Sequence, residues 1–421
     1  MSQDELGQAL LGQPARRERG IPGGKDPGPV PSVRLGAYIR RLRVGYGYTL
    51  RKVEERAMAL GESIDNSQLS RFEKGKAVPS FEKLRALARI FNVSVQNFSD
   101  ILDLEEFQAY KPMSEDYDDL LRSGEELYAR GQHGRAFVTF ERAFEISGSA
   151  ADEVGSAERI VEARRRMATA LRKLGKLFMT EHELREILKD GERISRRSRM
   201  RSLLQLSYVY RERGDLYLAS VLARECLTLA TEEGDLETQA SVVNTLGNIH
   251  YDQEEFADAL TYYRRALESL ETLGGHAEMR ALVLVNLGGS LVAADRFEEG
   301  LALIQQAHAR AREKGSRRIA ALSMTRLAEA YLVHGDPARS TQCLSESDAL
   351  ASGPEEAYHD ILFLNAFRRW EMARQDGNGT REKITFGRLR HLRSLLERKF
   401  PEVDKFDRYV ESTRRKHEDA S

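Results

Sequence analysis

The sequence predicts an all-α protein in which a small five-helix domain is followed by an α-solenoid of helical hairpins. Three observations lead to this fold class. From Val33 to Leu102, apolar residues recur at the spacing of buried helix faces. From about residue 117 the chain repeats itself with a period of roughly 40 residues. A chain of 421 residues is also too long for one ordinary core.

Five segments follow from these patterns. The first is rich in proline and glycine and lacks periodicity, which predicts disorder. The predicted segments are a disordered N-terminal arm (1–32), the five-helix domain (33–103), a linker (104–116), a repeat array of about seven hairpins (117–400) and a C-terminal tail (401–421).

Composition excludes several classes of protein. No stretch approaches the length of uncharged apolar residues that a membrane span needs, so no membrane partner is expected. The first 32 residues lack the apolar core of a signal peptide, so export is not expected. Cys226 and Cys343 are the only cysteines, which excludes a disulfide framework and fits a reducing cytoplasm.

The first two helices are predicted from apolar spacing and one capping residue. Leu35, Ile39 and Leu42 fall on one face of the first helix. Thr49 is a good N-cap for a second helix, which carries Val53 on its apolar face.

The third helix contains Leu69 and Phe72, and Asn66 or Ser67 is expected to cap it. Gly75 stands where a left-handed C-cap residue ends a helix. A fourth helix is expected after Ser80 and a fifth from near Ser94. The segment from Val33 to Leu102 holds 13 Lys and Arg against 7 Asp and Glu, a basic balance that suits a nucleic-acid-binding module.

The segment from Leu69 to Ser80, LSRFEKGKAVPS, is the most specific motif in the chain. Together with Leu35-Gly36 and Thr49-Leu50 before it and Leu84 after it, this motif resembles the λ-repressor-like (Xre) helix-turn-helix family. The resemblance covers about 70 residues and implies a DNA-binding domain. Its third helix would enter the major groove of double-stranded DNA, usually as a homodimer on a two-fold site.

The third helix should read bases with the polar face opposite Leu69 and Phe72. Asn and Gln side chains can bond adenine, and Arg can bond guanine. The predicted base contacts are Asn66, Ser67, Gln68 and Arg71. The resemblance places phosphate contacts at Thr49, Arg51, Lys52, Lys74 and Lys76.

The segment from Met58 to Gln68 is longer than the corresponding connection in the family. Either the second helix is extended or the turn is enlarged, which leaves the start of the third helix open.

In the repeats, a small residue is followed twelve places later by another and four places after that by a large one. The small pairs are Gly124 with Ala136, Gly247 with Ala259, and Gly288 with Gly300; the large residues are Phe140, Tyr263 and Ile304. Small residues let the two helices of a hairpin approach closely, and the large residue is expected to fill the groove of the next hairpin. Asn244 to His250, followed by Phe256, Ala259, Tyr263 and Ala266, resembles the tetratricopeptide repeat, although the period is longer than usual.

The tetratricopeptide resemblance implies a concave face that holds peptides or partner proteins. Asn can bond both groups of a peptide backbone, and Arg can bind a carboxylate. The predicted concave-groove contacts are Arg165, Arg172, Tyr208, Arg211, Asn244 and Asn248. The layout is similar to helix-turn-helix regulators that respond to secreted signalling peptides. A peptide ligand, a protein partner and a dimerisation scaffold all remain open.

The sequence lacks the phosphate-binding glycine loop and the His and Cys motifs of metal sites, so no enzyme, cofactor or metal is expected. His250 is interpreted as a packing residue. We therefore expect a DNA-binding transcription regulator whose array senses a peptide or protein, mediates dimerisation, or does both. The alternative is a scaffold whose helix-turn-helix domain contacts protein; a neutral or apolar third helix would favour it.

Overall fold

A computed structural model describes residues 32–149, 156–189, 194–353, 357–396 and 400–418. The chain divides into two compact units, Met1–Glu106 and Phe107–Ser421. Across the described residues the secondary structure is helical, with one isolated β-bridge between Ser352 and Ala357 and no strand. The predicted all-α fold class is thus confirmed. Of the predicted N-terminal arm, residues 1–31 lie outside the described residues.

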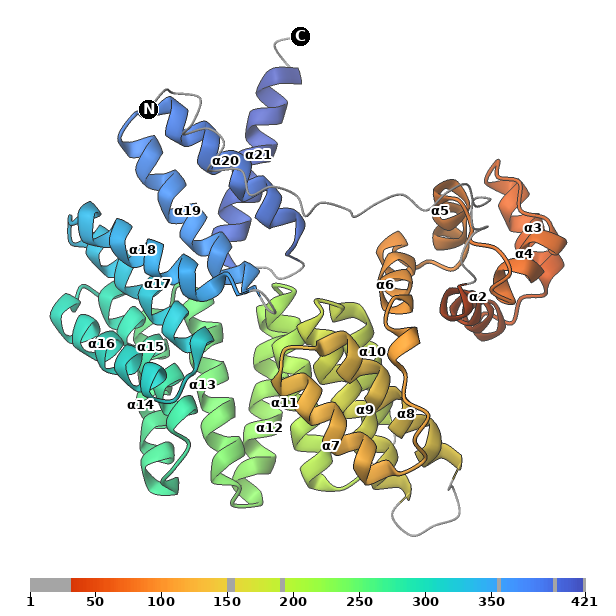
Figure 1. The fold of residues 1–421 in the computed structure, drawn as a ribbon, viewed down its shortest axis with the longest axis horizontal. Helices are drawn as coiled ribbons and strands as arrows, with labels where there is room; N and C mark the ends of the chain where they lie inside the picture. Colours follow the sequence, from red (N-terminus) through yellow and green to blue (C-terminus); the bar gives the residue numbers. More distant parts are fainter. Residues whose placement is uncertain (1–31, 150–155, 190–193, 354–356, 397–399, 419–421) are drawn as a thin grey trace, which may run out of the picture. The chain divides into compact units, whose positions relative to one another are not determined.

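The described part of the first unit, residues 32–106, holds five helices that pack against one another (Figure 1). They are α2 (Val33–Gly45), α3 (Leu50–Ala59), α4 (Asn66–Glu73), α5 (Phe81–Ile90) and α6 (Val95–Glu105). The residues predicted to point inward do so: Leu35, Ile39, Val53, Leu69 and Phe72 are all buried.

Two helix starts show how the sequence sets the boundaries. Thr49 caps α3 as predicted, because its Oγ1 accepts a hydrogen bond from the backbone N–H of Lys52 at 3.1 Å. The cap of α4, however, is Asp65 and not Asn66 or Ser67: Asp65 Oδ1 accepts from the N–H of Gln68 at 2.7 Å. Gln68 lies three residues after Asp65, which is the usual capping distance.

The extra residues after Ala57 mainly form an enlarged turn between α3 and α4. Helix α3 ends at Ala59, and Gly61 then adopts φ +75°, which is accessible to glycine at little cost. Ile64 is 2% exposed and anchors the turn in the core. Helix α4 therefore begins at Asn66.

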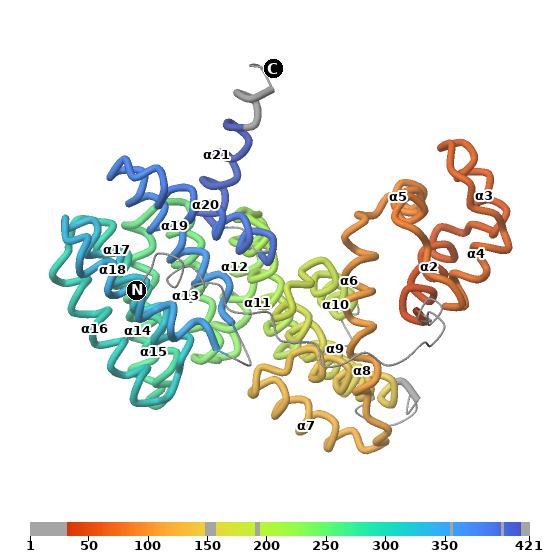
Figure 2. Tube along the Cα trace, turned by 45° about the horizontal axis from the view of Figure 1, so that its top comes forward, coloured from red at the N-terminus to blue at the C-terminus, as the bar shows by residue number. Residues whose placement is uncertain are grey.

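The second unit opens with the short helix η1 (Gln108–Tyr110) and continues as seven helical hairpins that lie side by side in a curved row (Figures 1 and 2). The hairpins are α7 (Tyr117–Ala129) with α8 (His133–Ser149), α9 (Ser156–Lys173) with α10 (Leu177–Lys189), α11 (Arg196–Glu212) with α12 (Leu216–Glu232), α13 (Leu236–Asp252) with α14 (Phe256–Leu273), α15 (Ala277–Ala293) with α16 (Phe297–Glu313), α17 (Arg317–Val333) with α18 (Pro337–Ala351), and α19 (His359–Gln375) with α20 (Gly379–Ser394). From α9 to α19, the first helices of successive hairpins contact one another, which puts them on the inner side of the row.

The small residues of the repeat make room for a large side chain of the same hairpin. A Cβ built on Gly247 would lie 2.6 Å from Tyr263 Cε1, and one on Gly288 would lie 2.6 Å from Ile304 Cγ1. These large residues also belong to the core shared with the next hairpin, as predicted: Tyr263 clusters with Val283 and Leu287, and Ile304 clusters with Met324 and Leu327. Close approach of a small pair is seen at Gly288, whose built Cβ would be 2.8 Å from the carbonyl oxygen of Gly300.

The C-terminal segment is not a tail over most of its length. Residues Pro401–Glu418 form helix α21, and Val403 and Phe406 are buried against the last hairpin. Trp370 stacks edge-on with Phe406 at a ring-centroid distance of 6.0 Å. The three-residue spacing of Val403 and Phe406 is typical of a packed helix face, which explains why this segment docks.

Candidate functional site

Helix α4 is held in the first unit by close backbone contact and by one ion pair. A Cβ built on Gly36 of α2 would lie 2.4 Å from the carbonyl oxygen of Phe72, so only glycine permits this approach. Gly75 adopts φ +65° and ends the helix as predicted. Arg43 forms a two-pronged pair with Glu73, with Nε–Oε1 at 2.6 Å and Nη2–Oε2 at 2.9 Å. These contacts fix the helix that carries the predicted base-reading residues.

The exposed face of α4 is polar. Asn66, Ser67 and Arg71 are exposed, while Leu69 and Phe72 are buried on the opposite face. Gln68 is only partly exposed, and its Oε1 accepts a hydrogen bond from Lys83 Nζ at 2.7 Å. A base contact by Gln68 would therefore require this bond to be exchanged.

The predicted phosphate contacts lie at two helix ends. Thr49 caps α3, and Arg51 and Lys52 in its first turn are exposed and contact Glu55 at 3.6 and 3.2 Å. Lys74 and Lys76 are exposed on either side of Gly75, and neither side chain has a hydrogen bond or ion pair within the described residues. The two lysines leave an uncompensated positive charge at the end of α4.

A groove of about 780 Å³ lies on the inner side of the array. Side chains from the first helices α9, α11, α13, α15, α17 and α19 line it, together with Glu402 at the start of α21. Five of the six predicted groove residues are among the lining residues: Arg172, Tyr208, Arg211, Asn244 and Asn248. Arg165 is not, although it lies on the same helix as Arg172.

Three asparagines form the uncharged middle of the groove. Asn286 Nδ2 donates to Asn244 Oδ1 at 3.2 Å and to Asn248 Oδ1 at 3.0 Å, and Asn248 Oδ1 also accepts from the hydroxyl of Tyr263 at 2.9 Å. The repeat pattern predicted Asn244 and Asn248 as groove residues, but Asn286 was not among the predicted residues. The signal was available, because Asn286 is the tenth residue of α15 just as Arg326 is the tenth of α17, and both line the groove.

The predicted groove arginines are paired within the protein. Arg211 bonds Asp252 through two nitrogens at 2.7 and 3.1 Å, and Arg172 Nη1 bonds Glu212 Oε1 at 2.8 Å. A ligand carboxylate that bound either arginine would therefore compete with a neighbouring acid. Asn244 and Asn248 carry no charge. Their Oδ1 atoms accept from Asn286, but their Nδ2 groups can donate to a ligand backbone without breaking an ion pair.

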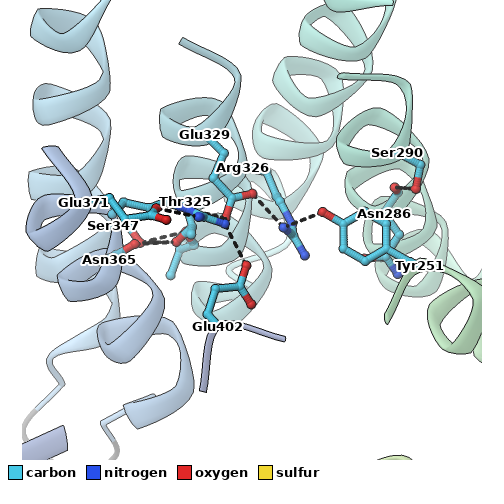
Figure 3. Close-up of polar contacts among 12 residues, drawn as sticks. Tyr251, Asn286, Ser290, Thr325, Arg326, Glu329, Ser347, Asn365, Glu371 and Glu402 are labelled. Atoms are coloured by element: carbon cyan, nitrogen blue, oxygen red, sulfur yellow. Dashed lines mark hydrogen bonds and ion pairs between the residues drawn. The ribbon is translucent and has the colours of Figure 1, made fainter. Parts of the chain in front are cut away.

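The far end of the groove is a network of partly buried charges (Figure 3). Glu329 Oε2 accepts from Arg326 Nη1 at 2.6 Å, and its Oε1 accepts from Arg368 Nη2 at 3.0 Å. Arg368 also bonds Glu402 at 2.7 Å, and Arg326 bonds the hydroxyl of Tyr251 at 3.0 Å. Burial by itself raises the pKa of Glu329, but the two arginines outweigh burial and lower this pKa to about 2.

The described residues contain few other side chains that could react or bind a metal ion. Cys226 and Cys343 are buried free thiols, and burial raises their pKa values to about 12 and about 11. One group could hold a metal ion: ligand atoms of His250, Glu255 and Asp258 lie within 4.8 Å of one another. The His250 ring stacks on Tyr262 at 5.0 Å, which agrees with its interpretation as a packing residue. None of the described helices is long and apolar enough to span a membrane.

Comparison with known proteins finds one matching segment in each unit. Residues 39–98 match the helix-turn-helix family model, and residues 198–272 match a tetratricopeptide repeat model. No curated protein matches the chain significantly.

Three solved structures share the fold. The apo form of RapI is 12% identical with a TM-score of 0.54, covering 66% of this chain and 98% of its own. A Rap protein complexed with Competence and Sporulation Factor is 16% identical with a TM-score of 0.54, covering 85% and 94%. The Rap conjugation gene regulator of plasmid pLS20, in complex with the Phr* peptide, is 15% identical with a TM-score of 0.51, covering 89% and 98%.

Proposed function

We propose that this chain, a helix-turn-helix segment joined to tetratricopeptide repeats, is a sequence-specific DNA-binding transcription regulator whose array binds a peptide. The observation that carries the proposal is the exposed face of α4. Asn66, Ser67 and Arg71 are presented to solvent there, on a helix whose other face is fixed in the core. This is the arrangement that major-groove reading requires.

Charge supports duplex DNA as the partner of the first unit. Lys74 and Lys76 are exposed and without a partner in the described part of the chain, so they can neutralise phosphates without breaking a protein contact. The exposed residues of α4 are polar, whereas an apolar face would favour a protein partner.

The groove supports a peptide as the ligand of the array. A volume of about 780 Å³ accommodates several residues of an extended chain. Asn244 and Asn248 offer amides that can pair with a peptide backbone whatever its sequence. Two Rap proteins of similar fold are complexes with the Phr* peptide and with Competence and Sporulation Factor, which is consistent with a peptide here.

We further propose that the regulator works as a cytoplasmic homodimer in which the array controls DNA affinity. Each hairpin contacts mainly its neighbours, so small rotations between hairpins can add up along the row. A peptide that binds one curvature better shifts the array toward it, by no more than its differential affinity for the two forms. If the spacing of the two α4 helices depends on that curvature, operator affinity changes with it.

The DNA part of the proposal is tested by genome-fragment selection followed by fluorescence anisotropy at several salt concentrations. We expect salt-dependent binding to a selected site, with affinity falling steeply as salt rises. Arg71→Ala should weaken that site and relax its base preference, whereas the control Arg224→Ala, an exposed arginine on α12, should not. Absence of salt-dependent affinity for every fragment would refute DNA binding.

A further inference from the structure

Four arginines gather where α9 and α11 lie side by side, beyond the groove residues Arg172 and Tyr208. They are Arg165 and Arg166 of α9 and Arg197 and Arg201 of α11. Arg201 is the sixth residue of α11. Leu282, Leu322 and Leu364 are the sixth residues of α15, α17 and α19, and all three line the groove. By repeat register Arg201 takes the position at which three later hairpins carry a groove-lining leucine, although Arg201 itself lies outside the lining of the 780 Å³ groove.

Carboxylates of the described residues pair two of these arginines and leave the other two without an ion pair. Glu162 bonds Arg165 through two nitrogens, at 2.5 and 3.0 Å, and bonds Arg166 at 2.7 Å. Arg166 also pairs with Glu125 at 2.5 Å. The side chains of Arg197 and Arg201 have neither a hydrogen bond nor an ion pair with any described residue. Burial lowers the pKa of Arg201, and Arg165, Arg197 and Arg166 lower it further, so the positive charges of this cluster repel one another.

Two other acidic residues near the cluster are hydrogen-bonded at the starts of helices α11 and α13. Glu158 accepts hydrogen bonds from the N–H of Ser195 and the hydroxyl of Ser198, both at 2.9 Å. Asp235 caps α13 through the N–H and hydroxyl of Thr238, at 3.0 and 2.7 Å. Neither carboxylate forms an ion pair with Arg197 or Arg201, so among the described residues no acceptor occupies either guanidinium group.

One turn further along the same two helices lies an unsatisfied acceptor. Gln205 Nε2 donates to Thr169 Oγ1 at 2.8 Å, and Thr169 in turn donates to the carbonyl of Arg165 at 3.0 Å. Because the Thr169 hydroxyl is already a donor, the Gln205 amide must present its NH₂ to it. Gln205 Oε1 is left buried without a hydrogen bond. It can accept from an N–H group, such as one in a peptide backbone.

We propose that Arg197 and Arg201 form a carboxylate subsite beside the α9–α11 end of the groove, which binds the acidic end of the peptide. This subsite rests on the proposed peptide-binding function and specifies in which orientation the peptide binds. Arginine matches a carboxylate with two parallel bonds, so a ligand carboxylate there relieves the repulsion. The network at the opposite end has three acidic residues and two arginines: Glu329, Glu371 and Glu402 with Arg326 and Arg368. This difference in charge between the two ends favours one orientation of the bound peptide.

Affinity selection with random heptapeptides tests this subsite on the full-length protein. One library has free C-terminal carboxylates and the other has C-terminal amides. We expect the wild type to enrich peptides with a carboxylate at one end. The double variant Arg197→Gln/Arg201→Gln should lose that preference by about tenfold or more while still retaining neutral peptides. The matched control Arg264→Gln, an exposed arginine on α14, should behave as the wild type.

The two libraries also identify the source of the carboxylate. Loss of binding on amidation assigns the subsite to the peptide C-terminus, and retention of amidated Asp or Glu peptides assigns it to a side chain. An unchanged acidic preference in the double variant overturns the subsite, as does a wild type that enriches peptides without regard to charge.

If the wild type retains no peptide, the proposed function fails, and citrate at constant ionic strength then tests the subsite alone. A citrate-dependent rise in Tm in the wild type, absent from the double variant, keeps the subsite. No rise overturns it.

Discussion

Replacement of Glu329 by Gln should destabilise the array, by an amount that depends on pH. Glu329 is 13% exposed and is shared by Arg326 and Arg368, so Glu329→Gln leaves two buried guanidinium groups short of a counter-charge. Removing one member of a buried charged network typically costs about 3–5 kcal/mol. Arg368 keeps Glu402 and Glu371 as partners, which favours the lower part of that range.

The pH dependence follows from the lowered pKa of Glu329. Burial opposes ionisation, but Arg326 and Arg368 bring this pKa from 4.5 to about 2. A carboxyl whose folded pKa is depressed stabilises the protein above its unfolded pKa, and that contribution disappears as pH falls through the folded value. The linked free energy is about 3 kcal/mol at pH 7 and roughly half of that at pH 3.

Urea unfolding of wild type and Glu329→Gln, followed by circular dichroism between pH 7 and pH 3, measures both effects. We expect the difference in unfolding free energy to shrink steadily below about pH 4.5. Glu299, an exposed residue that pairs with Arg296, provides the control: Glu299→Gln should change the unfolding free energy little at any pH. A difference for Glu329→Gln that stays constant across this range would refute the assignment of Glu329 as the ionised centre of the network.

Three further outcomes are expected. In the first unit, Arg71→Ala should cost about 1–3 kcal/mol on the selected DNA site, whereas Lys74→Ala should weaken all sequences alike and reduce the salt slope in anisotropy titrations. Gly247→Ala should destabilise the array by about 1–3 kcal/mol in urea unfolding, because its Cβ would overlap the buried ring of Tyr263; a neutral result would contradict the hairpin packing. Native Cys226, whose pKa burial raises to about 12, should react with Ellman's reagent at pH 8 only after unfolding, so rapid labelling of the native protein would count against its burial.

The fold followed from local signals that repeat along the chain. Leu69 and Phe72 mark the buried face of α4 by their spacing, and the small residues at Gly247 and Gly288 mark where two helices of a hairpin approach. The partner of Gly247 could not be chosen from spacing, because Ala259 and Tyr263 are one turn apart on the same helix. Helix α21 was missed because its apolar face packs on the last hairpin instead of extending the repeat.

The position of the groove could be predicted from the sequence, but the ion pairs among its charged residues could not. Repeat register brings Asn244, Asn248 and Arg211 to one surface, as expected. The pairing of Arg211 with Asp252 spans 41 residues and joins two hairpins, so it depends on how adjacent repeats stack. Arg165 lies outside the groove lining, and its side chain bonds Glu162 three residues earlier in its own helix.

Coupling between the two units is the central claim, and one titration tests it most directly. The affinity of the full-length protein for its selected DNA site is measured with and without a peptide enriched from the heptapeptide libraries, for the wild type and for Asn244→Ala/Asn248→Ala. The account predicts that the peptide changes wild-type DNA affinity by about 5- to 150-fold and leaves the double variant unchanged. Equal peptide responses in the two proteins, or a peptide that binds the wild type without any change in DNA affinity, would contradict the claim.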